Sequence, residues 1–153
     1  LDRDAPLATL GRLVQEDFCL MERRGAEHVL TAAVLCFPAS WSLDDKFGRP
    51  LARIHAPVPD YDPEIARRVQ RLFDGVRAGR PLWRFNRLPC DDPALFQPRR
   101  ETERRPAPRE AAYLRSERQC LWRLARTGAV VFSIHTYVLR REPRGSEQEG
   151  RPR

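Results

Sequence analysis

The stretch AVVFSIHTYVL, residues 129–139, is the part of the sequence on which the fold class depends. It is rich in β-branched and aromatic residues and follows Gly128, a combination that predicts a β-strand. Because side chains along a strand point alternately to the two faces of a sheet, Ser133, His135 and Tyr137 share one face. A hydroxyl, an imidazole and a phenol on one face can line a polar pocket, or can face water, as one side of an antiparallel sheet often does.

The N-terminal part of the chain predicts a second antiparallel pair. Residues 12–22 (RLVQEDFCLME) mix polar and apolar positions as an extended segment does, and residues 28–37 (HVLTAAVLCF) form a dense apolar run. Gly25 lies in the polar turn between them, so the two segments predict a β-hairpin. Further along, residues 113–124 (YLRSERQCLWRL) fit either a helix or a strand.

The middle of the chain combines a long connection with one helix. Residues 38–62 are rich in proline and predict a loop, and the segment from Asp62 to about Val76 has the capping residue and apolar stripe of a helix. Residues 82–88 alternate with period two and predict a strand that ends at Pro89. This order of elements predicts a mixed α+β domain on an antiparallel sheet.

Length and composition limit the number of domains and the kinds of partner. A chain of 153 residues forms about one domain. We expect residues 1–139 to form it, with residues 97–112 as a loop and residues 140–153 as a disordered tail. No segment approaches the run of about 18 apolar residues that spans a membrane, so no membrane partner is expected. The four scattered cysteines have neither zinc-ribbon nor c-type heme spacing, which is typical of free thiols in a reducing cytoplasm.

The net charge of +7 raises the possibility of nucleic-acid binding, but its distribution argues against it. Residues 99–109 hold five Arg and two Glu, and residues 140–153 hold five Arg and three Glu, so most of the excess lies in expected loops. Among the 28 basic residues only Lys46 is a lysine, which indicates a compositional bias rather than selection for phosphate contacts. We expect no nucleic-acid partner.

A single histidine lies in an unusually stiff setting within KFGRPLARIHAPVP, residues 46–59. The prolines that follow His55 restrict the backbone, so its imidazole is held in one direction. Such an imidazole suits a metal or heme iron, although a histidine braced by a turn has the same pattern. Near the predicted C-terminal strand, Glu117 lies beside Arg115 and Arg118, and this cluster fits either a substrate-orienting carboxylate or surface ion pairs.

Several reaction classes lack their motifs in this chain. There is no G-x-S-x-G, no glycine-rich phosphate loop and no H-E-x-x-H. There is also no dinucleotide-binding fingerprint, so any electrons for a redox reaction would come from another protein.

Four segments in register resemble the heme-dependent oxidative N-demethylase-like family. They run in order over residues 12–139, nearly all of the predicted domain. The segments are LVQEDFCLM (13–21), VLCFP to IHAPVP (34–59), DDPALFQP (91–98), and ERQ (117–119) together with TGAVVF (127–132) and TYV (136–138).

The resemblance implies a PAS-like, heme-binding α subunit of a monooxygenase that uses O₂ to remove a methyl group from a small secondary amine such as dimethylamine. A separate reductase subunit with flavin and an iron–sulfur centre would supply electrons from NADPH. Because the chain has no C-x-x-C-H motif, the cofactor would be heme b. The family has more chain before the first segment, so this chain resembles a fragment without its N-terminal part.

By matching positions, the resemblance implies that His55 is the proximal iron ligand and that Pro57 and Arg118 contact the heme. Glu117 and Tyr137 become candidate catalytic groups of the substrate pocket, where a carboxylate could pair with a cationic amine.

His135 is a departure from the family, which usually has arginine at that place in the strand. It is a further candidate catalytic residue and a rival iron ligand. Because sites change more readily than folds, a non-enzymatic heme or small-molecule binding module of the same fold is the alternative function. A second alternative is a cofactor-free domain in which the histidine of residues 46–59 only braces a loop.

Overall fold

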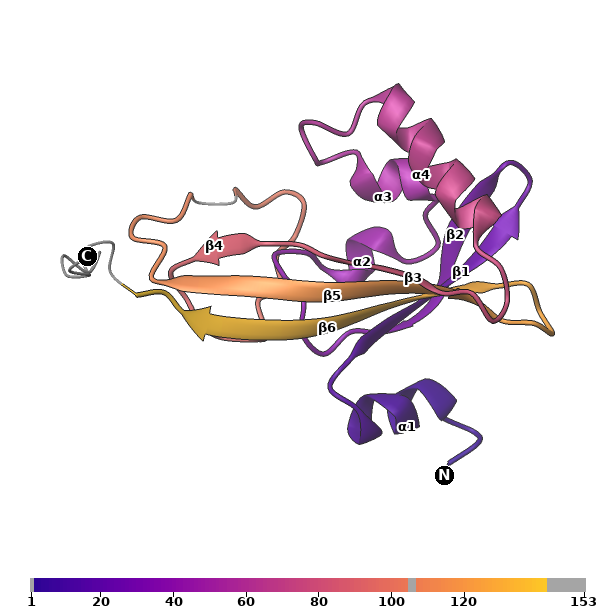
Figure 1. The fold of residues 1–153 in the computed structure, drawn as a ribbon, viewed down its shortest axis with the longest axis horizontal. Helices are drawn as coiled ribbons and strands as arrows, with labels where there is room; N and C mark the ends of the chain where they lie inside the picture. Colours follow the sequence, from indigo (N-terminus) through magenta and orange to yellow (C-terminus); the bar gives the residue numbers. More distant parts are fainter. Residues whose placement is uncertain (1, 105–106, 143–153) are drawn as a thin grey trace, which may run out of the picture.

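The computed structural model describes residues 2–104 and 107–142 as one mixed α+β fold (Figure 1). The elements in chain order are α1 (Pro6–Leu13), β1 (Asp17–Arg24), β2 (Glu27–Val34), α2 (Leu43–Lys46), α3 (Leu51–His55), α4 (Pro63–Gly75), β3 (Leu82–Phe85), β4 (Leu88–Cys90), β5 (Tyr113–Arg123) and β6 (Val130–Arg140).

All six strands form one sheet in the order β2-β1-β6-β5-β3, with β4 also paired to β5. Every ladder is antiparallel. The N-terminal hairpin and the last strand therefore lie side by side, because β1 pairs with β6 in the middle of the sheet. The predicted α+β class with an antiparallel sheet is confirmed.

The longest strands are β5 and β6, which form one hairpin. Their ladder runs without interruption from Tyr113 opposite Arg140 to Arg123 opposite Val130. Gly128 adopts a φ of 74° between the two strands, a conformation that glycine takes without steric cost. The ambiguous residues 113–124 are thus a strand, because pairing with β6 decides between two conformations that the local sequence leaves open.

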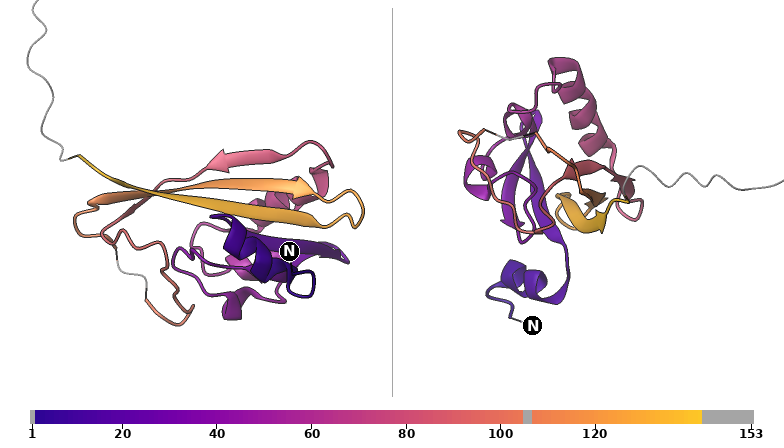
Figure 2. Two further views of the ribbon diagram at one scale, coloured as in Figure 1. Left: turned by 90° about the horizontal axis from the view of Figure 1, so that it is seen from below. Right: turned by 90° about the vertical axis from the view of Figure 1, so that its left-hand side faces the viewer.

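The sheet has one well-covered face and one that is largely open. Helices α2, α3 and α4 lie over the first, the core face, while α1 lies on the other side near β2 (Figures 1 and 2). The opposite side of β3, β5 and β6 forms the open face, where Trp83, Phe85, Trp122, Tyr137 and Leu139 are exposed. The buried core cluster on the core face is Cys19, Met21, Leu30, Leu51, Phe73, Val76, Leu121 and Val130.

Two predictions about the N-terminal half need correction. Residues 12 and 13 end α1 instead of starting a strand, and β1 begins only at Asp17. Residues 38–62, predicted to be a loop, contain the short helices α2 and α3. Their stability comes from distant contacts that the local sequence does not display, above all the burial of Leu51 in the core.

The predicted helix from Asp62 is confirmed as α4, and the Asp62 side chain accepts a hydrogen bond from the Ile65 backbone N–H (2.7 Å). Its apolar stripe packs on the core through Val69, Phe73 and the following Val76, whereas Ile65 and Leu72 are exposed.

The predicted strand of residues 82–88 is divided between β3 and β4. Pro89 was expected to end a strand and instead lies within β4, which is possible because this short strand lies at an edge of the sheet. At the other end of the chain, β6 continues through Arg140, so residue 140 belongs to a strand and not to the predicted tail. The rest of that prediction, from residue 143, lies outside the described residues.

A buried arginine joins two loops to the far end of the β5–β6 hairpin. Arg115 is 2% exposed and donates hydrogen bonds to the Phe37 carbonyl, the Leu95 carbonyl (3.0 Å) and the Thr136 hydroxyl (3.3 Å). It also forms an ion pair with Glu117 (3.4 Å), which is buried as well. One side chain thus connects β5, β6 and the loops that follow β2 and β4.

Replacing this arginine should strongly destabilise the fold. We expect Arg115→Met to lower the free energy of unfolding by about 3–5 kcal/mol, because it leaves the Glu117 carboxylate buried without its cation. The matched control is Arg118→Met on the same strand, whose half-exposed ion pair with Glu16 should contribute little to stability. Urea unfolding followed by circular dichroism measures both, and equal losses would contradict the role given to Arg115.

Candidate functional site

His55 is the last residue of α3, and its ring is held by one contact at its edge and one at its face. Its Nδ1 lies 2.9 Å from the Leu51 carbonyl oxygen, one helical turn earlier. Its ring stacks on Tyr61, with ring centroids 4.6 Å apart and planes 18° from parallel. The helix thus sets the position of the imidazole and the segment after it sets the ring plane.

The surroundings of His55 favour a neutral imidazole with a free lone pair. Burial lowers the pKa of His55 below its usual value, and the positive charges of Lys46 and Arg84 lower it further against the opposing effect of the Leu51 carbonyl. Because a carbonyl oxygen can only accept a hydrogen bond, Nδ1 carries the proton of the neutral ring. The lone pair is then on Nε2, which is the arrangement found in metal-binding histidines.

An ion-pair network fixes α3 to a distant loop. Glu101 accepts hydrogen bonds from Lys46 Nζ (2.7 Å) and Arg53 Nη2 (2.9 Å), and its backbone N–H donates to Asp45 (2.9 Å). Lys46 also donates to the Ile54 carbonyl, next to His55. The two cations lower the pKa of Glu101 to about 2. The described parts of the predicted loop, residues 97–104 and 107–112, contain no helix or named strand, but Glu101 ties this segment to the helix that carries His55.

Glu117 lies on the core face, and both of its oxygens are engaged. Besides its ion pair with Arg115, it accepts hydrogen bonds from Asn86 Nδ2 (2.7 Å) and Gln119 Nε2 (3.1 Å). Gln119 in turn accepts from Arg84 Nε (2.9 Å). Arg115 and Glu117 are buried rather than at the surface, and Gln119 connects Glu117 with the exposed Arg84, whose charge acts on His55.

A second cluster lies on the open face. Glu16, just before β1, forms an ion pair with Arg118 (2.9 Å) and lies 3.6 Å from His135 Nδ1. The rings of His135 and Tyr137 are 4.6 Å apart, and Phe85 is a further neighbour of Tyr137, with ring centroids 6.4 Å apart. The strand register explains the grouping, because Arg118 pairs with His135 across β5 and β6.

The residues predicted from sequence thus divide between two faces of the sheet. Helix α3, with His55 and the exposed Pro57 just after it, lies over the core face, as does Glu117. Arg118, His135 and Tyr137 project from the open face. The structure therefore does not bring the six residues together in one pocket.

Sequence reasoning did not find several side chains that define these two sites. Tyr61 and Arg84 shape the surroundings of His55, Glu101 fixes its helix, and Glu16 completes the open-face cluster. Each approaches its partner through the tertiary fold. The only local signal was the proximity of Tyr61 to the proline-rich segment after His55.

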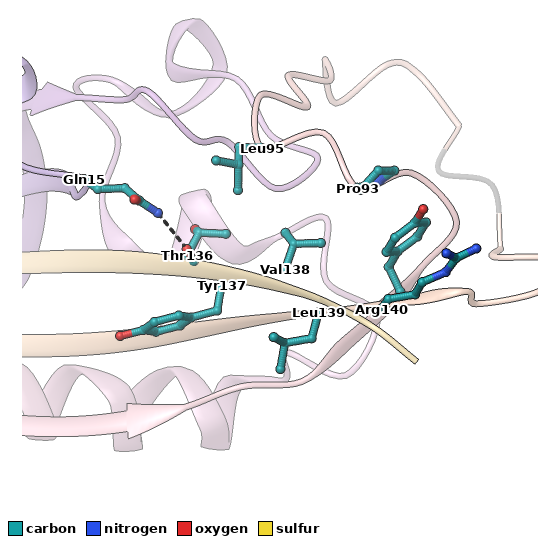
Figure 3. Close-up of a pocket in the computed structure, with 9 residues that line it drawn as sticks. Gln15, Pro93, Leu95, Thr136, Tyr137, Val138, Leu139 and Arg140 are labelled. Atoms are coloured by element: carbon teal, nitrogen blue, oxygen red, sulfur yellow. Dashed lines mark hydrogen bonds between the residues drawn. The ribbon is translucent and has the colours of Figure 1, made fainter. Parts of the chain in front are cut away.

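A pocket of about 420 Å³ lies along the end of β6 (Figure 3). Of the predicted site residues, only Tyr137 lines it. A smaller pocket of about 170 Å³ includes Leu51, Ala52 and Gln70 in its lining, on α3 and α4.

Within residues 2–104 and 107–142, no three His, Cys, Asp or Glu side chains gather as a metal site would require. None of the helices described combines the length and the apolar run needed to cross a bilayer.

Fold and site together define a mixed α+β protein with a fixed, neutral histidine beside its sheet. Residues 2–150 match the family described as "Haem-dependent oxidative N-demethylase, alpha subunit-like". The chain belongs to this family, which confirms the resemblance found in its sequence.

The titration of His55 should reflect its burial. We expect its midpoint below the ordinary value of about 6.5, measured by NMR as the shift of its ring protons with pH. Because the unfolded chain then binds this proton more tightly, His55 lowers the free energy of unfolding as the pH falls through the unfolded-state value.

The variant Tyr61→Ala should move the midpoint of His55 upward, since it exposes the ring to water. The signals of His135, on the other face, provide the control and should not change. A midpoint at or above 6.5 in the unsubstituted protein would contradict this description of His55.

The Glu101 network should stabilise the fold in a defined range of pH. Because its pKa is lowered to about 2, the ionised Glu101 stabilises the folded state above its ordinary pKa of 4.5, and this stabilisation is lost as the pH falls toward 2. We expect Glu101→Gln to cost about 2 kcal/mol at pH 7.

The stability difference between Glu101→Gln and the unsubstituted protein should shrink progressively below pH 4.5, as urea unfolding at a series of pH values would show. The control Glu64→Gln breaks an exposed pair within α4 and should change stability little. A difference that stays constant down to pH 3 would refute the role of the Glu101 charge.

Proposed function

We propose that this chain is the heme-binding part of a monooxygenase that removes a methyl group from a small secondary amine such as dimethylamine. Membership of the N-demethylase α-subunit-like family supports the reaction class. The observation that carries the proposal is the setting of His55: its Nδ1 lies at hydrogen-bond distance from the Leu51 carbonyl, burial lowers its pKa, and no group in the described part of the chain is hydrogen-bonded to its Nε2. An imidazole so prepared fits an iron ligand.

In this proposal His55 binds the iron of heme b through Nε2, and the bound heme supplies the activation of O₂. The Leu51 carbonyl keeps the proton on Nδ1 and Tyr61 maintains the ring plane. Pro57, just after α3, offers an apolar contact. Arg84 is available for an acidic group of the cofactor, and Gln119 orients it by accepting from its Nε.

The proposed role of Glu117 follows from its contacts. Its oxygens already accept from Asn86 and Gln119 and pair with Arg115, so in this proposal it orients Gln119, and through it Arg84. It acts as a positioning residue for the site around His55.

The open-face cluster supports a rival arrangement. His135 could instead hold the iron, with Arg118 and Tyr137 beside the heme, and Glu16 would then orient the imidazole. The two histidines lie on opposite sides of the sheet, so one chain uses one or the other. We favour His55 because a strong hydrogen bond to a backbone carbonyl sets its tautomer.

The electrons would come from a separate reductase subunit with flavin and an iron–sulfur centre. The absence of a dinucleotide-binding fingerprint from the sequence supports this division of labour. The family description, which names an alpha subunit, supports assembly with other subunits.

The second candidate is a non-enzymatic heme or small-molecule binding module. The burial of Glu117 favours it, because the carboxylate expected to meet a cationic amine is already paired. Such a module would bind heme but would not consume dimethylamine when supplied with a reductase and NADPH.

Heme titration of the purified chain tests the proposed ligand. We expect a Soret band that saturates at one heme per chain and heme affinity that falls at least tenfold, or about 1.4 kcal/mol, in His55→Ala. His135→Ala is the matched control and should keep the band. Loss of the band only in His135→Ala would select the rival ligand, and no saturable binding by the folded chain would refute the heme proposal.

A further inference from the structure

Strand β6 has a free edge at its C-terminal end. β1 pairs with β6 only from Val130 to Ile134, since the chain turns away before Asp17. From residue 135 onward, β6 is paired on its β5 side alone. Within the described part of the chain, the final part of β6 therefore has a strand partner on one side only.

The hydrogen-bond pattern shows which backbone groups point away from β5. The Arg141 N–H donates to the Ala112 carbonyl (2.8 Å) across the hairpin. Because backbone groups alternate in direction along a strand, Thr136, Val138 and Arg140 direct their N–H and C=O groups to the free edge.

One side chain already occupies the beginning of this edge. Gln15 Nε2 donates to the Thr136 carbonyl (3.1 Å), taking the place that a backbone N–H of β1 would have had (Figure 3). In residues 2–104 and 107–142, no backbone or side-chain group is hydrogen-bonded to the outward groups of Val138 or Arg140. An unpaired edge of this kind is a template for an added strand.

The pocket of about 420 Å³ follows the same edge and has apolar walls on both sides of β6. Leu95, Pro93 and Val138 lie on one side, and Tyr137 and Leu139 project on the other (Figure 3). An added strand points its side chains alternately to the two faces, so both walls would contact it.

The positive charge at the end of β6 indicates what kind of added strand the free edge would bind. Arg140 lines the pocket and forms no ion pair within the described part of the chain, while Arg141 bonds to the Ala111 carbonyl at the same end. Residues 136–140 contain no acidic side chain, and the chain as a whole carries +7. A second copy that paired through the same edge residues, 136–140, would bring no carboxylate from them to Arg140, whereas an acidic segment would.

We propose that the edge of β6 from Thr136 to Arg140 binds an extended segment of a partner polypeptide as an added strand, with apolar side chains along the pocket and a carboxylate at Arg140. Backbone hydrogen bonds to Val138 and Arg140 provide the affinity, and the pocket walls and the free guanidinium select the sequence. This binding does not depend on heme or on the identity of the iron ligand.

The test uses the full chain and three synthetic peptides of about six residues, the length that the free edge accommodates. The probe is an acetylated, amidated peptide of Val-Glu repeats. The controls are a Val-Lys peptide and a Val-Glu peptide with N-methylated backbone, which cannot form a ladder. Amide hydrogen exchange and chemical shifts are measured by NMR.

We expect the Val-Glu peptide to slow exchange of the Val138 and Arg140 amides at least about tenfold, while the β5-facing Leu139 amide is slow throughout. The Val-Lys and N-methylated peptides should have no such effect. Slowing by all three peptides, or by none, would overturn the proposal. Concentration-dependent protection of Val138 without peptide would also overturn it, in favour of a second copy.

Substitutions at Val138 and Arg140 distinguish the contribution of the backbone hydrogen bonds to peptide binding from that of the Arg140 side chain. Val138→Pro removes the outward N–H and keeps the β5 ladder, so it should abolish binding, whereas Val138→Thr retains the N–H and a similar shape and should bind. Arg140→Gln should weaken Val-Glu binding severalfold. Unchanged binding by folded Val138→Pro would overturn the proposal, and if that variant does not fold, the Arg140→Gln comparison and the exchange data decide.

Discussion

The arrangement of this protein depends on how the short corner at Cys36 and Phe37 is held between two strands. Asp17 of β1 accepts hydrogen bonds from the backbone N–H groups of both residues (2.6 and 2.9 Å), and Arg115 of β5 donates to the Phe37 carbonyl. Burial raises the pKa of Asp17 although two N–H groups stabilise its charge. With this corner in place, the chain passes from the sheet into α2 and α3, and so to His55.

The buried charges on the core face contribute more to the positioning of the loops than to the stability of the fold. Burying an ion pair such as Arg115 and Glu117 costs desolvation, which apolar residues of similar size would avoid. The pair instead sets the geometry of this region, because one planar guanidinium binds two loop carbonyls and a carboxylate and so fixes their relative positions. The loops that cover this end of the sheet are thereby held in one arrangement.

Much of the fold could be predicted from local sequence, but the grouping of the site residues could not. The alternating segment of residues 129–139 predicts the strand that the structure shows as β6 (Val130–Arg140), and Asp62 caps α4 as expected. The helix that carries His55 was missed because its stability comes from Leu51 in the core and from Glu101, 46 positions after His55. Short helices held by such distant contacts leave little trace in local sequence.

The division of the site residues between two faces depends on register. Glu117 and Arg118 are neighbours in sequence and therefore point to opposite sides of β5. Which of them faces α3 is decided by pairing with β3 and β6, which depends on turn and loop geometry far from either residue. In the family motif the two residues are adjacent in sequence, but in the folded sheet their side chains lie on opposite faces.

Chemical rescue with free imidazole tests directly whether His55 holds the heme iron. In His55→Gly, the space of the missing ring beside Tyr61 is available to free imidazole, so adding imidazole to the heme-loaded variant should restore the spectrum of the unsubstituted protein in a saturable way. His135→Gly should need no imidazole. If His55→Gly binds heme with the unsubstituted spectrum before imidazole is added, His55 does not hold the iron.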